Sequence, residues 1–211
     1  MAINATNNGT RRELIPAGNY IARCYQMIEI GTINEVILGA SKQLHKVRIG
    51  WELPTELRVF DEAKGEQPLV ISKDYTLSLN EKSNLRKMLA SWRGKDFTEA
   101  EAKCFDITVL VGIPCMLNII HKPKKTDPTA IFEEIGSISA MPKGVMPAAA
   151  INKPFVLSYD TWNDEKFQTL PDFIKTKMQG SLEYAALKTP NSKDINHVDE
   201  INSDDANDLP F

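Results

Sequence analysis

Five stretches of the chain show the alternation of apolar and polar residues, or the enrichment in branched and aromatic residues, that is typical of β-strands. The clearest is residues 42–54, KQLHKVRIGWELP, in which every second residue from Val47 to Leu53 is apolar. Such a strand turns one face to a core and the other to solvent, and Pro54 is expected to end it. The predicted strands are residues 20–30, 42–54, 69–79, 113–122 and 131–141.

Apolar residues at helical spacing predict a helix between the third and fourth strands. Residues 80–94, NEKSNLRKMLASWRG, begin with a candidate N-cap, Asn80, and end with a candidate C-terminal stop, Gly94. The spacing places the apolar residues on one face, which would pack on the strands. They are Leu85, Met88, Leu89 and Trp92. Residues 96–112 are expected to add a turn or a short helix.

A second amphipathic helix is predicted to start near Pro171, and we expect it to pack back on the body of the protein. Its apolar residues are Leu170, Phe173, Ile174 and Met178. Residues 32–41, TINEVILGAS, are expected to form a loop or a short hairpin. Residues 55–68 are polar and contain Gly and Pro, so they are expected to form a connecting loop.

The order of the predicted elements defines the expected fold. Three strands, a helix and two further strands follow one another as in a five-stranded OB-fold barrel with an α-helix between strands 3 and 4, although small mixed α/β domains can share this order. We therefore expect a mainly β protein. Its expected parts are a flexible arm (1–14), an OB-fold domain (15–142), an extension with an amphipathic helix (143–187) and a disordered acidic tail (188–211).

Charge is divided unevenly along the chain, whose formal net charge is −3. Residues 194–211 hold six acidic side chains and neither Lys nor Arg, which leaves 22 acidic against 25 basic residues in 1–193. The body is therefore about +3 and the tail −6. A cationic body suits nucleic acid as a partner. The negative net charge of the whole chain alone would not suggest such a partner.

Alternation also places cations and aromatic rings together on the outward faces of the first three strands. A groove of this kind suits a single nucleic-acid strand, because cations displace counterions from the phosphates and rings stack on bases without reading sequence. Lysines in HKPKK, after the fourth strand, would extend the groove. The candidate DNA-binding residues are Arg23, Tyr25, Lys46, Arg48, Trp51, Lys73, Tyr75, Lys122, Lys124 and Lys125.

Each of these candidates has a purely structural alternative. Lys46 and Arg48 could form the solvated face of a strand, and HKPKK could be a solvated loop. The two tyrosines could be half-buried barrel residues. Trp51 lies on the apolar side of its strand, so it belongs either in the core or at the mouth of the groove. Trp92 is expected in the core, because it completes the helix stripe.

Four segments of the body resemble the OB-fold single-stranded DNA-binding proteins of tailed bacteriophages. They are GNYIARCYQMIEIGT, RIGWELP, ISKDYTLSLNEKSNLRKMLASWRGKDFTEAEAKCFDI and LVGIPCMLNIIHK, and the likeness runs from about Gly18 to Met141. The ending DDANDLPF is similar in kind to the acidic, Phe-terminated tails of bacterial and phage single-strand binders. The resemblance implies DNA binding by the barrel in phage replication, recombination and repair. It also implies recruitment of replication or recombination enzymes by the tail. The candidate DNA-binding residues are not taken from the resemblance; they follow from the alternation of side chains along the strands.

The acidic tail is predicted to stay disordered, because its carboxylates repel one another and few of its residues are apolar. A basic-rimmed apolar pocket on a partner could admit Phe211 while an arginine there binds the terminal carboxylate. The tail could also occupy the protein's own cationic groove when DNA is absent. A merely solubilising tail is the alternative. The candidate partner-binding residues are Asp204, Asp205, Asp208, Leu209, Pro210 and Phe211.

The sequence predicts neither export nor a membrane span. No run approaches 18 apolar residues, and the N-terminus lacks the apolar middle of a signal peptide. The three cysteines Cys24, Cys104 and Cys115 are odd in number and lack metal-ligand spacing, so we expect them to be reduced. Together with the resemblance, these features favour the cytoplasm of an infected bacterial host.

An enzyme is the main rival class, and the sequence argues against it. His45, His121 and His197 are scattered, Glu133 and Glu134 would point to opposite faces of a strand, and neither a phosphate-cradling Gly-rich loop nor a zinc pattern is present. We therefore expect no catalysis, cofactor or metal, and rank a nuclease below a single-strand annealing or recombination-mediator protein. An adaptor that binds no DNA is a further alternative. The sequence leaves open whether the chain works as a monomer or a homo-oligomer.

Overall fold

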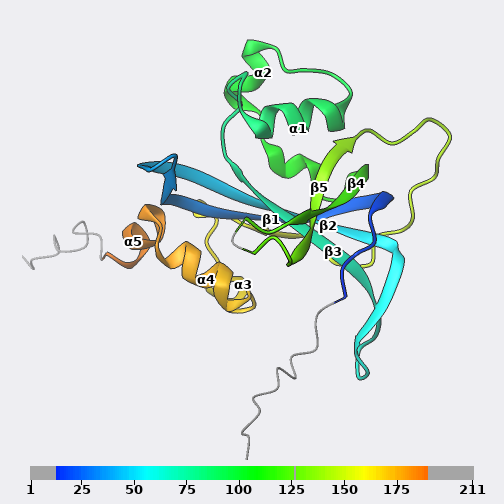
Figure 1. Ribbon diagram of the computed structural model, residues 1–211. Coiled ribbons are helices and arrows are strands. Elements are labelled where there is room, and N and C mark those ends of the chain that lie inside the picture. Colours follow the sequence, from blue (N-terminus) through cyan, green and yellow to red (C-terminus); the bar gives the residue numbers. More distant parts are fainter. Residues whose placement is uncertain (1–12, 126, 190–211) are drawn as a thin grey trace, which may run out of the picture.

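A curled antiparallel sheet of five strands forms the centre of the molecule and has the shape of a half-barrel (Figure 1). The computed structural model describes residues 13–125 and 127–189. Neighbouring strands follow the order β3-β2-β1-β4-β5, so β3 and β5 form the two edges. The strands are β1 (Gly18–Ile37), β2 (Ala40–Asp61), β3 (Gly65–Thr76), β4 (Pro114–Pro123) and β5 (Ile131–Ser139), and the short β6 (Phe155–Leu157) pairs in parallel with β1.

Helices cover the half-barrel at two places (Figure 1). Between β3 and β4 lie α1 (Asn84–Arg93), α2 (Glu99–Cys104) and the 3-10 helix η1 (Ile107–Leu110). After β6 come α3 (Asp164–Gln168), α4 (Asp172–Gln179) and α5 (Leu182–Lys188). Within residues 13–125 and 127–189, none of the helices has the length and apolar character needed to cross a membrane.

Strand β1 is shared between two hydrophobic cores. Its pairing with β2 shifts register between Cys24 and Gln26, and again between Glu29 and Gly31. Such bulges change which face a following residue occupies. Cys24 and Met27 accordingly belong to the core inside the half-barrel, whereas Ile28 packs in a second core with residues of β6, α3 and α4. The bulges therefore allow one strand to hold both the half-barrel and the C-terminal extension.

The predicted helix between the third and fourth strands is confirmed and closes one end of the half-barrel. Leu85, Leu89 and Trp92 are buried, and the Trp92 ring lies 6.0 Å from that of Trp51 in β2. Gly94 ends the helix with φ +73°, as expected of a C-terminal stop. The N-cap is Ser83 and not Asn80: the Ser83 hydroxyl accepts a hydrogen bond from the Arg86 amide.

Two sequence expectations about β2 and β3 are wrong. Pro54 does not end the strand, because the pairing of β2 with β3 shifts register between Leu53 and Leu57 and accommodates the missing amide there. Residues 55–68, expected as a connecting loop, instead complete the two strands and the turn between them. The stretch 32–41 forms the hairpin that joins β1 to β2, which was one of its two expected forms.

The C-terminal extension packs back on β1, as predicted, but it is larger than one helix. Leu170, Ile174 and Met178 are buried in the second core, whereas Phe173 is 55% exposed and its ring lies beneath the guanidinium of Arg48, 5.1 Å away. The expected flexible arm includes Glu13, which is described and forms an ion pair with Arg58. Residues 1–12 and 190–211, which hold most of the arm and nearly all of the acidic tail, lie outside the described residues.

Candidate nucleic-acid interface

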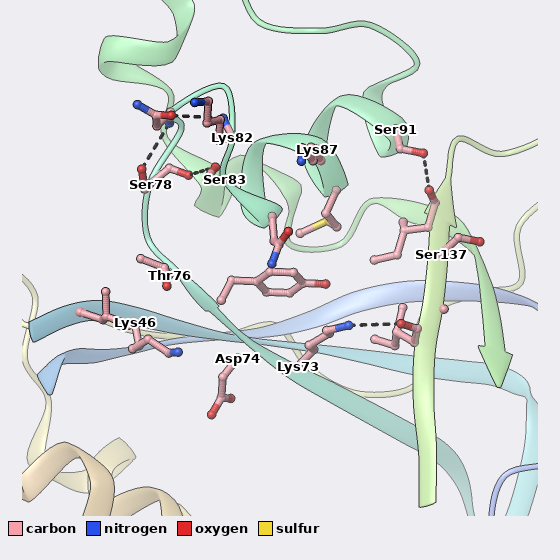
Figure 2. Close-up of a pocket in the computed structure, with 18 of the residues that line it drawn as sticks. Lys46, Lys73, Asp74, Thr76, Ser78, Lys82, Ser83, Lys87, Ser91 and Ser137 are labelled. Atoms are coloured by element: carbon pink, nitrogen blue, oxygen red, sulfur yellow. Dashed lines mark hydrogen bonds between the residues drawn. The ribbon is translucent and has the colours of Figure 1, made fainter. Parts of the chain in front are cut away.

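An open trough of about 1160 Å³ lies between the strands and α1 (Figure 2). Five lysines line it, from β2, β3, the turn before α1, and α1 itself, whereas Asp74 is the one carboxylate among the described residues of its wall. We call this cavity the lysine trough. A concave surface with this excess of positive charge attracts phosphates. The lysines are Lys42, Lys46, Lys73, Lys82 and Lys87.

A hydrogen-bonded turn places the start of α1 over the trough (Figure 2). The Ser83 hydroxyl donates to the carbonyl of Ser78 at 2.6 Å, and the Asn80 side chain accepts from the Lys82 amide at 3.1 Å. These bonds hold the turn between β3 and α1 in one shape. Lys82 and Lys87 are both exposed at this rim, so their ammonium groups are free to turn towards a ligand.

One lysine of the trough bridges the open side of the half-barrel. The Lys73 ammonium donates to Glu134 Oε1 at 3.0 Å and to the Ile135 carbonyl at 3.3 Å, joining β3 to β5, two strands that do not pair in the described part of the chain. Lys122 binds the other oxygen of Glu134 at 2.8 Å. Hydrogen bonds from Lys122 and Lys73 hold the pKa of Glu134 below its usual range.

The floor of the trough contains one aromatic residue among the described lining residues, Tyr75. Its side chain is only 6% exposed, and burial raises the pKa of its hydroxyl, which therefore stays protonated. A ring at this depth packs against the core, so it offers little surface for stacking on a base. The expectation that Tyr75 is a half-buried barrel residue fits this position better than the stacking role.

No family model, curated protein or solved structure matches this chain. Across residues 13–125 and 127–189, no group of three or more His, Cys, Asp or Glu side chains is arranged to hold a metal ion. The functional argument therefore rests on the residues and the charge of the lysine trough.

Of the cations named from the sequence, the structure brings Lys46 and Lys73 together in the lysine trough. Arg23 lies elsewhere: its guanidinium donates to the carbonyls of Gly112 and Ala148 and ties the extension to the half-barrel. Arg48 also lies outside the trough, where it binds Asp74 at 2.7 Å. Backbone carbonyls hold Arg23 and a carboxylate holds Arg48. Lys46 and Lys73 are also ion-paired, with Glu35 at 2.9 Å and Glu134 at 3.0 Å, but they line the trough and the two arginines do not.

The placement of Trp51 at the mouth of a groove is wrong. Its side chain is 0% exposed, because alternation along β2 turns it inward beside Ile49 and Leu53. Trp51 thus belongs to the core, which was the first of the two positions expected from the sequence. Tyr25 is half-buried, and burial raises its pKa.

The lysines of HKPKK, at the end of β4 and just after it, do not line the lysine trough. Lys122 is bound to Glu134, while Lys124 and Lys125 are exposed in the loop between β4 and β5 and are not part of the trough wall. For these two, the expected alternative of a solvated loop matches the structure.

Three lysines of the trough were missed from the sequence. Lys42, Leu44 and Lys46 are every second residue of β2 and all three line the trough. The strand alternation that identified Lys46 could therefore have identified Lys42 as well. Lys82 and Lys87 carried no such signal, since only the folded chain brings the start of α1 opposite β2. The predicted partner-binding residues 204–211 lie outside the described residues.

Proposed function

We propose that this protein binds single-stranded DNA without sequence preference and that the lysine trough holds the phosphate backbone. The supporting observation is the set of five lysines around one cavity of about 1160 Å³, with one carboxylate among the described lining residues. Each phosphate neutralised by a lysine releases a condensed counterion, which favours binding entropically and independently of sequence. Hydroxyl and amide side chains such as Ser78 and Asn80 add neutral contacts at the rim.

The proposal includes an OB-type barrel as the scaffold. The strand order β3-β2-β1-β4-β5, with a helix between β3 and β4, is what an OB barrel opened between β3 and β5 would have. Such barrels commonly bind oligonucleotides over strands 2 and 3 and the adjoining loops. The lysine trough lies over the corresponding strands, which supports a single strand as the ligand.

In this proposal the protein covers unpaired strands during phage replication, recombination and repair, and its acidic tail recruits the enzymes of those processes. The segment DDANDLPF combines negative charge with an aromatic ring, which suits a basic-rimmed apolar pocket. Many tails on one coated strand would raise the effective concentration of a modest binding site.

Replacing Lys82 and Lys87 together by alanine is expected to weaken binding of oligo-dT. Each lost phosphate contact lowers the magnitude of the log–log salt slope by about 0.7, so two contacts correspond to roughly 25-fold weaker binding at 0.1 M salt. The measurement is a titration followed by intrinsic tryptophan fluorescence at several salt concentrations. Both side chains are exposed, so the melting temperature should not change.

The matched control for the lysine trough is Lys64→Ala with Lys143→Ala, which removes two exposed lysines that do not line the trough. This variant should keep the affinity and salt slope of the wild type. Equal weakening by both double variants, or equal binding of duplex and single strand, would refute the trough as the DNA site.

Deleting residues 204–211 is expected to leave DNA binding unchanged or tighter, because the deletion removes three of the tail's carboxylates and no lysine. Capture of replication or recombination enzymes by the immobilised protein should disappear. The two properties are measured by oligo-dT titration and by pull-down with the full-length chain as reference. A loss of DNA binding on this deletion would contradict the assigned roles of body and tail.

A further inference from the structure

A second cavity, of about 390 Å³, lies where the two hydrophobic cores meet. Met27 and Val47 of its wall belong to the core inside the half-barrel, whereas Leu157 belongs to the second core. Its other lining residues come from the segment after β3, from α2 and η1 with the turn between them, and from β6 and the residues after it. We call this cavity the seam cleft. Its volume falls in the range of about 300–1,000 Å³ that is usual for ligand pockets.

The seam cleft exposes apolar side chains that its own walls do not cover. Leu77 is 37% exposed, and Leu79, Phe105 and Val156 are only partly buried. Removing such surface from water by contact with another apolar group is favourable. The cleft therefore suits an occupant that carries apolar side chains.

The charge of the seam cleft is opposite to that of the lysine trough. Its described lining residues include three carboxylates, Glu29, Asp106 and Asp160, and one cation, Lys103. Asp106 and Asp160 are exposed, and the described part of the chain offers Asp160 no ion-pair partner. A surface with this excess of negative charge attracts cations and repels phosphates. The charge therefore favours a basic occupant and disfavours nucleic acid.

We propose that the seam cleft is a docking site for a basic amphipathic segment of a partner protein, whose apolar side chains enter the cleft while its cations face Asp106 and Asp160. Amphipathic helices bind apolar grooves in this way, through residues spaced i, i+3, i+4 and i+7. The site needs no DNA, so the inference stands apart from the proposed function. Ser78 lines both cavities, so a docked partner adjoins the lysine trough without occupying its lysines.

The probe is a synthetic peptide of three Leu-Lys-Lys-Leu repeats, compared with a peptide in which every lysine is replaced by glutamate. Cys104 lies in the cleft wall and is exposed, whereas Cys24 and Cys115 are buried, and burial raises the pKa of both thiols. A maleimide therefore modifies Cys104 first. We expect the lysine peptide to bind the full-length chain and to slow this modification, and the glutamate peptide to do neither.

The variant Asp106→Asn with Asp160→Asn tests the charge of the rim. Asparagine keeps the side-chain oxygen that accepts from the Thr108 amide, so the cap of η1 is retained. Binding of the lysine peptide, measured by isothermal titration calorimetry, should weaken about fivefold, as expected for the loss of two exposed ion pairs. The matched control is Glu62→Gln with Glu66→Gln, two exposed carboxylates that do not line the cleft, and it should bind as the wild type does.

Three outcomes would overturn the inference. Absence of binding by the lysine peptide is the first, and equal binding of the glutamate peptide is the second, because the rim would then not select its occupant. The third is equal weakening by both double variants without protection of Cys104, which would place the peptide on another acidic part of the chain. Thermal melting followed by circular dichroism should be the same for the wild type and both double variants, since all four substitutions change exposed side chains.

Discussion

Replacing Trp51 by alanine is expected to lower the free energy of unfolding by about 3–5 kcal/mol, the usual cost of truncating a large buried aromatic side chain. The ring is 0% exposed and packs at 6.0 Å from the ring of Trp92, so its loss leaves a cavity between β2 and α1. The measurement is chemical denaturation followed by circular dichroism. A cost below about 1 kcal/mol would mean that the ring is not in a packed core.

Replacing each tryptophan by phenylalanine compares what the two indole N–H groups contribute to stability. The Trp51 Nε1 atom has no hydrogen-bond partner among the described residues, whereas Trp92 Nε1 donates to the Pro114 carbonyl at 3.0 Å. Trp51→Phe removes an unsatisfied donor, but Trp92→Phe leaves a carbonyl without its partner. We therefore expect Trp92→Phe to destabilise the protein more than Trp51→Phe.

Replacing Gly31 by alanine is expected to be the second large effect, at about 2–4 kcal/mol. Gly31 has φ +88°, and an added Cβ would lie 2.7 Å from Ser181 Cβ and 2.6 Å from Glu183 Oε2. Ser181 caps α5, and Glu183 accepts hydrogen bonds from the amide and hydroxyl of Thr32 at 2.6 Å each. The new methyl group must push α5 away from β1, so these bonds are lost.

Gly65→Ala is the control for Gly31→Ala, because Gly65 has φ +66° with open space around its added Cβ. It should show only the backbone strain, about 1 kcal/mol. Thermal unfolding measures both variants, and limited proteolysis of α5 reports the detachment directly. Equal destabilisation by the two substitutions would show that the collision with Ser181 is relieved without moving α5.

The strand pattern was predictable because alternation reflects burial directly. Val47, Ile49 and Trp51 are buried as their spacing indicates. Leu85, Leu89 and Trp92 of the α1 stripe are buried as helical spacing indicates, and Met88 is partly buried. The continuation of β2 beyond Pro54 was not predictable from the same rule, since a register shift in the pairing with β3 accommodates that residue.

The candidate site was predictable only in part, because alternation within one strand carries no information about the other segments that pack on it. Alternation assigns a residue to one side of a strand, but it does not say what covers that side. Arg23 and Lys46 both occupy outward positions, yet Arg23 donates to the carbonyl of Ala148 in the extension, whereas Lys46 lines the trough and binds Glu35. What an outward residue contacts therefore depends on segments distant in sequence.

The sequence by itself determined the mainly β character, the helix between the third and fourth strands, and the division into a cationic body and an acidic tail, because each is a property of local composition and spacing. Only the tertiary structure decided that Lys42, Lys82 and Lys87 line one cavity and that Lys73 bridges β3 to β5. These groupings arise where the sheet curls and α1 closes one end, and the contacts that produce them join residues far apart in the chain.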